Sequence, residues 1–178
     1  MKKKIFLGSL ILIILVLGIF SLTGCGAKKE ENKEQATQVV DETLVKINGL
    51  EFHLNKEAEF KGLKYVIANE FKEVTHDRYV QYNYYQEDST NLLFYRVFHY
   101  ENQGKEKAIE DLGLDSNIEL KDGKTDNIEY KFYEQPRNDG GTIHFYFIEK
   151  DGNTYVVNFV SKYDIKDFEE KVVKSVKF

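Results

Sequence analysis

The stretch from Thr142 to Ser161 reads TIHFYFIEKDGNTYVVNFVS and holds two apolar arms around a polar turn. Side chains along each arm alternate between two faces, a pattern that is typical of a β-strand. We expect the two arms to place their apolar side chains against each other, with Ile143, Phe145 and Phe147 on one arm and Tyr155, Val157 and Phe159 on the other. The turn contains Asp151-Gly152, a pair that tolerates the positive φ angles of a tight turn. The stretch therefore predicts an antiparallel β-hairpin.

The same signals predict strands elsewhere in the chain. Asn48-Gly49 separates Leu44–Ile47 from Leu50–Leu54, which predicts a second hairpin. Runs rich in Tyr, Val, Leu, Ile and Phe predict further strands at Lys64–Ala68, Phe71–Val74, Arg78–Gln86, Leu92–Tyr100, Ile118–Leu120 and Ile128–Glu134. Among them, Arg78–Gln86 and Leu92–Tyr100 are expected to pair across a polar turn.

Two segments have the periodicity of short helices. Gly104–Leu112 places its apolar residues on one face and its charged residues on the other, and Gly113 ends it. Ile165–Lys174 has Asp164 as its expected N-cap and a buried stripe that includes Phe168 and Val172. Together these elements predict an α+β fold, an antiparallel sheet with two main helices packed against one face.

This order of elements, closing in Ser175-Val176-Lys177-Phe178, resembles the PsbP-like fold of photosystem extrinsic subunits, a Ran-binding nuclear protein and small bacterial lipoproteins. The resemblance spans Leu44–Phe178. It implies a binding or assembly scaffold without enzymatic activity. No local family motif matches, so the resemblance transfers no functional residue.

The first 24 residues have the layout of a secretory signal peptide. Lys2, Lys3 and Lys4 precede an apolar run from Ile5 to Phe20, and small residues follow. A transmembrane helix is the alternative. It is disfavoured because the run is about 16 residues long and a bilayer needs about 20.

Leu22-Thr23-Gly24-Cys25 resembles a bacterial lipobox, and Cys25 is the only cysteine of the chain. The resemblance implies cleavage after Gly24 and a diacylglycerol thioether on Cys25, whose two acyl chains give stable membrane anchoring. The polar, mixed-charge residues that follow predict a flexible tether. The expected organisation is a signal peptide at 1–24, the lipidated cysteine and tether at 25–43, and a single α+β domain at 44–178.

Composition narrows the partners and the location. The chain has 178 residues, of which 42% are hydrophobic, enough for one globular core. Lys2, Lys3 and Lys4 are the only charged residues before Cys25, so residues 25–178 carry 22 basic and 30 acidic side chains, a formal charge of −8. That balance disfavours nucleic acid as a partner. The Lys, Asn, Ile and Glu richness favours a Gram-positive bacterium, where a lipid-anchored protein sits on the extracytoplasmic face of the cell membrane.

No residue pattern indicates catalysis, a metal or a cofactor. Cys25 is the lone cysteine, which excludes disulfides and thiolate metal sites. The four histidines lack ligand spacing: His53, His99 and His144 are expected at surface or edge positions, and His76 in a polar turn that enters a strand. No nucleophile motif such as GxSxG occurs. We therefore expect no catalytic, metal-binding or cofactor-binding residue.

The Tyr-rich stretch YVQYNYYQ at 79–86 is the best candidate for a contact surface. Alternation puts Tyr79, Gln81, Asn83 and Tyr85 on one face and Val80, Tyr82 and Tyr84 on the other. An exposed face of Tyr, Asn and Gln suits contact with proteins or sugars. We predict a binding surface at Tyr79, Tyr85 and Arg96, which Tyr95 and Tyr100 extend. The alternative is that tyrosine simply favours half-buried strand positions.

The sequence thus favours a membrane-anchored, non-enzymatic binding or assembly module of the cell envelope, with another envelope protein or polymer as its partner. A small-solute or carbohydrate-binding receptor component is the alternative, although one domain of about 135 residues lacks the two lobes of most such receptors. An envelope hydrolase is the least favoured class because the sequence offers no nucleophile or metal pattern.

Overall fold

A computed structural model describes residues 41–85 and 91–178, which belong to a compact unit running from Val40 to Phe178. The predicted signal peptide, Cys25 and nearly all of the predicted tether lie outside the described residues. Within the described ranges, no helix has the length and apolar character needed to cross a membrane.

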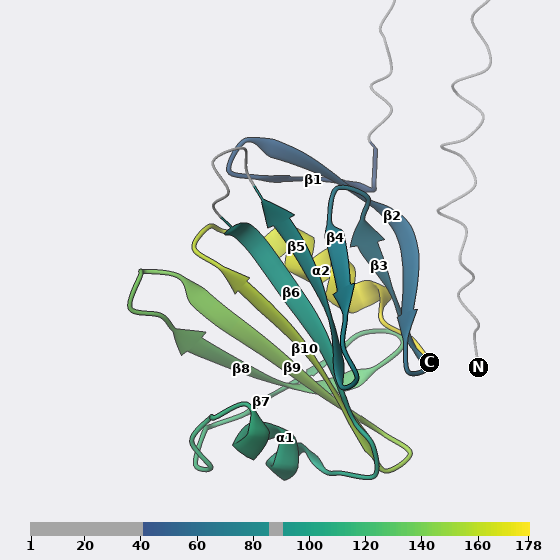
Figure 1. The fold of residues 1–178 in the computed structure, drawn as a ribbon, viewed down its shortest axis with the longest axis vertical. Helices are drawn as coiled ribbons and strands as arrows, with labels where there is room; N and C mark the ends of the chain where they lie inside the picture. Colours follow the sequence, from purple (N-terminus) through teal and green to yellow (C-terminus); the bar gives the residue numbers. More distant parts are fainter. Residues whose placement is uncertain (1–40, 86–90) are drawn as a thin grey trace, which may run out of the picture. The chain divides into compact units, whose positions relative to one another are not determined.

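The fold is α+β and is dominated by two antiparallel sheets (Figure 1). The small sheet contains β1 (Leu44–Ile47), β2 (Leu50–Phe60) and β3 (Leu63–Ala68) in that order. The large sheet has the order β4-β5-β6-β10-β9-β8-β7. Its strands are β4 (Lys72–Thr75), β5 (Tyr79–Tyr85), β6 (Asn91–Tyr100), β7 (Lys121–Lys124), β8 (Glu129–Pro136), β9 (Thr142–Lys150) and β10 (Asn153–Ser161).

Strand β10 lies in the middle of the large sheet and is buried on both faces. Every residue from Thr154 to Ser161 is buried. Tyr155, Val157 and Phe159 belong to the core on the inner face, the side of the small sheet, whereas Val156 belongs to a second core on the outer face. Both faces of the hairpin must therefore pack against another layer of the structure.

The two helices supply those covers from opposite sides, so the expectation of helices on one face is wrong. Helix α2 (Lys166–Ser175) packs with the small sheet over the inner face, through Phe168 and Val172. Helix α1 (Lys105–Asp111) packs on the outer face through Ala108 and Ile109. Its position is fixed by the β9–β10 hairpin, because the Thr154 hydroxyl donates to the carbonyl of Gln103 (2.8 Å). Asp164 was expected as the N-cap of α2, but the N-cap is the next residue, Ile165. The Asp164 carboxylate accepts a hydrogen bond from the backbone N–H of Lys166 (3.0 Å).

Three hairpins close through two-residue turns in which both residues have positive φ. Asn48-Gly49 and Asp151-Gly152 confirm the predicted turns, and Lys61-Gly62 joins β2 to β3 in the same way. This backbone matches the right-handed twist of the strands on either side. It also fixes each register, and in the β9–β10 hairpin it pairs Val156 with Phe147.

Register corrects two expectations. Because Phe145 lies opposite Asn158 and Phe147 opposite Val156, the two predicted sets of facing side chains lie on opposite faces of the sheet. The segment Ile118–Leu120 is not a strand. The strand begins at Lys121 instead, and Asp122-Gly123-Lys124 pairs with β8. Gly123 allows this because the ring of Tyr130 covers the space that a Cβ atom would need.

Four tyrosines are buried in the inner core, namely Tyr65, Tyr82, Tyr95 and Tyr155. The Tyr65 and Tyr82 hydroxyls share a hydrogen bond (2.8 Å), and burial raises the pKa of Tyr82 to about 12. Tyr95 is fully buried between aromatic rings, and its hydroxyl has no hydrogen-bond partner among the described residues. Burial raises its pKa well above the usual value. An unpaired buried hydroxyl is destabilising.

We predict opposite effects for the same substitution at two of these positions. Tyr95→Phe removes an unpaired hydroxyl and raises the free energy of unfolding by about 1 kcal/mol. Tyr82→Phe leaves the buried Tyr65 hydroxyl without its partner and lowers the free energy by about 1 kcal/mol. Urea unfolding followed by circular dichroism measures both; equal destabilisation by the two variants would contradict the assignment.

Candidate binding site

The outer face of β5 and β6 carries the polar and aromatic side chains that the sequence pointed to. Val80 and Tyr82 are buried in the inner core, as the alternation predicted, which directs Tyr79, Gln81 and Asn83 to the outer face. Strand β6 adds Arg96, paired directly with Gln81. The β-strand period of two thus places one polar set on a single surface.

Arg96 is held in place by its neighbours on that surface. Its Nε donates to Oε1 of Gln81, whose own amide nitrogen donates to Oδ1 of Asn83 (2.6 Å). The guanidinium carbon lies 4.8 Å from the centroid of the Phe94 ring and 5.8 Å from that of Tyr79. Partial burial lowers the pKa of Arg96, yet the group stays charged at neutral pH. The result is an ordered cation between two ring faces.

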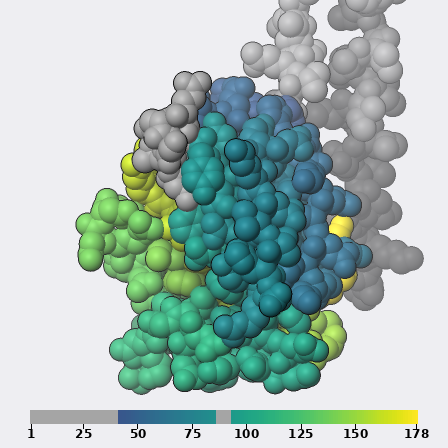
Figure 2. Space-filling view, in the orientation of Figure 1, coloured from purple at the N-terminus to yellow at the C-terminus, as the bar shows by residue number. Residues whose placement is uncertain are grey.

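A pocket of about 500 Å³ opens beside Tyr79, between the β4–β5 turn and the end of α1. We call it the β5–α1 pocket. It is lined by Thr75, His76, Asp77, Arg78, Tyr79, Phe98, Tyr100, Asp111 and Leu112. Figure 2 shows the β4–β5 turn lying against the α1 segment at one end of the domain. Volumes of 300–1,000 Å³ are typical of small-ligand sites.

Four aromatic rings follow one another along this pocket. The ring centroids of His76 and Tyr79 are 4.3 Å apart and stacked, those of Tyr79 and Phe98 are 5.1 Å apart, and those of Phe98 and Tyr100 are 6.4 Å apart. Tyr79 and Phe98 are half-buried, whereas Tyr100 forms part of the buried outer core. Burial and the nearby charge of Asp111 raise the pKa of Tyr100 to about 12.

An ion pair across the pocket joins the β4–β5 turn to the helix. Nη1 of Arg78 lies 3.1 Å from one carboxylate oxygen of Asp111, and Nζ of Lys107 lies 2.8 Å from the other. These contacts lower the pKa of Asp111, so it is ionised at neutral pH. The pocket therefore offers an aromatic wall beside a paired donor and acceptor.

The structure brings together two of the three predicted site residues. Tyr79 lines the pocket, and Arg96 lies over its ring. Tyr85 is 47% exposed, but six residues along β5 place it about 20 Å from Tyr79. The proposed extension to Tyr95 is wrong, because Tyr95 points into the inner core, while Tyr100 does line the pocket.

Sequence reasoning missed Phe98 and Asp111 as pocket residues. Phe98 could have been found, since it alternates with Arg96 on β6. Asp111 could not, because nothing local indicates that the end of α1 reaches the β4–β5 turn, 33 residues away.

A separate titratable cluster ties α2 to the inner face of the large sheet. Nδ1 of His144, on β9, lies 2.7 Å from a carboxylate oxygen of Glu169, which is only 4% exposed, and Nε2 lies 3.6 Å from Glu134 on β8. His144 was expected at a surface or edge position, but its side chain is 20% exposed. Because the imidazole stands between the two carboxylates, they do not form an open acid–base pair.

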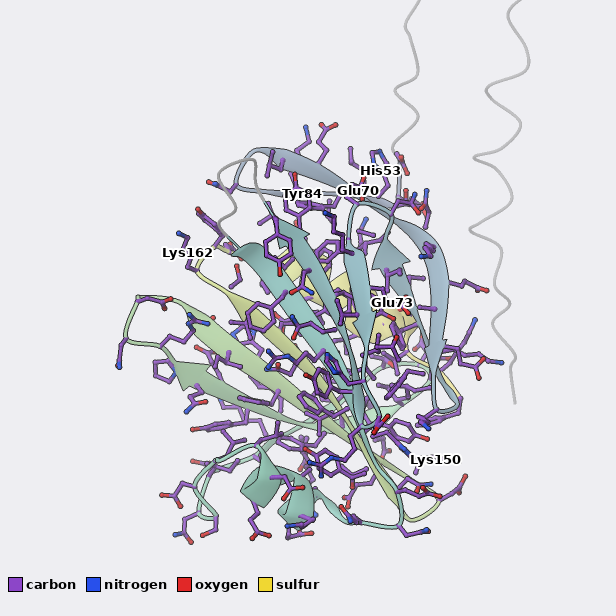
Figure 3. All side chains as sticks on the ribbon, in the orientation of Figure 1. His53, Glu70, Glu73, Tyr84, Lys150 and Lys162 are labelled. Carbon is purple, nitrogen blue, oxygen red and sulfur yellow. The ribbon has the colours of Figure 1, made fainter. Side chains whose placement is uncertain are left out.

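The remaining polar contacts are more exposed. His53 and Glu70 lie side by side, with Nδ1 3.0 Å from Oε1 (Figure 3). Among residues 41–85 and 91–178, no group of three or more His, Cys, Asp or Glu side chains is arranged to hold a metal ion.

Comparison with known proteins finds similarity only to solved structures, one of them a distant neighbour. No family model matches the sequence, and no curated protein matches it. A crystal structure at 1.50 Å resolution from Bacteroides thetaiotaomicron VPI-5482 is similar, with a TM-score of 0.47 and 10% sequence identity. The match covers 65% of this chain and 44% of that chain, so this chain spans less than half of its neighbour.

The His144–Glu169 contact predicts a pH dependence of stability. Burial alone lowers the pKa of His144, but the hydrogen bond to Glu169 and the charges of Glu169 and Glu134 outweigh it, so the net pKa lies above the ordinary 6.5. The stabilisation is complete below pH 6.5 and is lost as the pH rises through the folded-state pKa. We expect the free energy of unfolding to fall over that range, and to fall less in His144→Gln.

Urea unfolding of both proteins at a series of pH values measures this difference. His53, whose pKa is raised, and His99, whose pKa is lowered by burial, are present in both chains and cancel. Parallel pH profiles for wild type and variant would show that His144 does not carry the effect.

Proposed function

We propose that this protein is a lipid-anchored, extracytoplasmic, non-enzymatic binding module of the cell envelope that binds its partner through the outer face of the large sheet, at the β5–α1 pocket. We further propose that the domain belongs to the PsbP-like class of scaffolds, which rests on the order of its elements and on the terminal amphipathic helix.

The observation that carries the binding proposal is the β5–α1 pocket itself. Its wall is a row of rings that includes Tyr79 and Phe98, and its charged groups, Arg78 and Asp111, are already paired with each other. Rigid aromatic side chains bury much area at little entropic cost, which suits recognition. Because the carboxylate and the guanidinium are paired with each other, they are better suited to hydrogen-bonding a ligand than to taking a proton from it.

The place of the pocket in the domain agrees with an anchor at Cys25. The described chain enters at β1, and Figure 1 shows β1 and the α1 segment at opposite ends of the domain. The point at which the chain enters the domain therefore lies away from the pocket, so an attachment there does not block the pocket.

The same pocket also supports the alternative of a carbohydrate or small-solute receptor, because a pocket of this volume suits a small ligand better than the flat surface of a partner protein. A hydrolase gains none from the two carboxylates at His144, because the imidazole fills the space between them.

The anchor has a direct test. The intact mass of the chain extracted from membranes of its host should equal that of a chain beginning at Cys25 with a diacylglyceryl group attached. Cys25→Ala should yield no lipidated species and should leave the membrane fraction or remain uncleaved. A wild-type chain with its first 24 residues intact and no lipid would contradict the anchor.

The binding face is tested by site-specific photocrosslinking in the host. A benzophenone side chain in place of Tyr79 should give covalent adducts, because that position lies in the pocket wall. The matched control is Phe178, an aromatic residue that is 44% exposed and contacts Tyr155, a side chain of the inner core. Adducts at 178 but not at 79 would overturn the assigned face.

A further inference from the structure

We infer that the β5–α1 pocket binds an uncharged sugar ring, presented as one unit of a glycan chain. The inference rests on the proposed function and specifies the ligand for the same pocket. It follows from three properties of the pocket: the row of aromatic rings along its wall, the paired charges beside them and the polar surface that continues from them.

The aromatic wall suits the apolar face of a sugar. Tyr79 and Phe98 are half-buried side chains with centroids 5.1 Å apart, and packing against neighbours on both sides holds them, His76 on one and Tyr100 on the other. The C–H groups of a pyranose ring form a flat patch that packs on such rings. A ligand whose faces are apolar and whose edges are polar fits this lining better than a purely apolar one.

The Arg78–Asp111 pair suits the hydroxyl edge of the same ring. A guanidinium donates hydrogen bonds and a carboxylate accepts them, so the two groups, 3.1 Å apart, can hold two adjacent hydroxyls at once. Arg78 and Lys107 are countered by Asp111 and by Asp77, which lines the same pocket, so these four groups carry no net formal charge. Residues 25–178 carry a formal charge of −8, which repels anions. The ligand expected here is therefore uncharged.

The surface beyond Tyr79 favours a chain over a single sugar. Arg96 lies over the Tyr79 and Phe94 rings, and Gln81, which is half-buried, follows along β5. These groups continue the aromatic and hydrogen-bonding surface away from the pocket. A second and third sugar unit bound in the pocket's extension would contact them, so an oligosaccharide should bind more tightly than its monomer.

Saturation-transfer NMR on the full chain, purified from membranes in detergent, tests the inference. The probes are glucose, N-acetylglucosamine and their β-1,4-linked hexamers, with a heparin hexasaccharide as the anionic comparison. We expect transfer to the ring C–H protons of at least one neutral hexamer, weaker transfer to its monomer and none to heparin. Competition titrations then give the dissociation constants.

Variants assign the binding to the pocket. Tyr79→Ala should weaken binding of the neutral hexamer by about tenfold, and Tyr79→Phe, which keeps the ring, should restore it. Asp111→Asn should also weaken binding, because it removes the charged acceptor of the pair. Phe178→Ala is the control and should bind like the wild type, since Phe178 does not line the pocket. Circular dichroism checks that each variant is folded.

Several outcomes would overturn the sugar assignment. Among them are no transfer to any neutral sugar, preference for heparin, and neutral-sugar binding that Tyr79→Ala leaves unchanged. The crosslink at position 79 separates this failure from failure of the proposed function. A protein adduct at 79 without glycan binding rejects the sugar and keeps the binding face, whereas no adduct and no glycan binding reject both.

Discussion

The fold depends on one constraint, the burial of β10 on both of its faces. Eight consecutive residues, Thr154–Ser161, are removed from water, and a strand whose side chains alternate can be buried this way only between two layers. The inner layer is the small sheet with α2, and the outer layer is α1 with the loop after it. Because β10 pairs with β6 on one side and β9 on the other, every other strand of the large sheet takes its position from it. The Asp151-Gly152 turn matters for the same reason, since it sets the register that sends Val156 outward and Val157 inward.

The unequal size of the two layers creates the candidate site. The inner layer has three strands and a helix, while the outer layer has a helix of seven residues that meets only part of the sheet. Where α1 ends, the outer face of β5 and β6 loses its cover, and the rings of Tyr79 and Phe98 remain half-buried beside the charged end of the helix. The pocket therefore lies on the outer face of the large sheet, at the place where α1 ceases to pack against that face. On the inner face, Glu169 and His144 join helix to sheet through a buried charge-assisted contact, a structural role that leaves the polar groups of the outer face available for a ligand.

Local signals predicted most elements and half of the site. The turns at Asn48-Gly49 and Asp151-Gly152, and both helices, could be found because their chemistry is local. Lys61-Gly62 adopts the same turn between Phe60 and Leu63 but was not predicted, because lysine, unlike asparagine or aspartate, does not favour a positive φ. The placement of α1 opposite α2 could not be predicted, because the side of the sheet that a helix covers depends on long-range packing. Tyr79 and Arg96 followed from alternation along single strands, whereas Asp111 depends on a contact across 33 residues. Tyr95 was misplaced because it precedes Arg96 directly, and neighbours in a strand point to opposite faces.

The central claim is that the uncovered part of the outer face is where a ligand binds. Hydrogen–deuterium exchange of the full chain, read by mass spectrometry with and without fragments of the host's wall glycan, tests it most directly. The account predicts that β10 exchanges slowest in both samples, because it is covered on both faces, and that the fragments slow exchange in the β4–β5 turn and at the end of α1. Slowing confined to the inner face, around β8 and α2, or no slowing in any segment would contradict it.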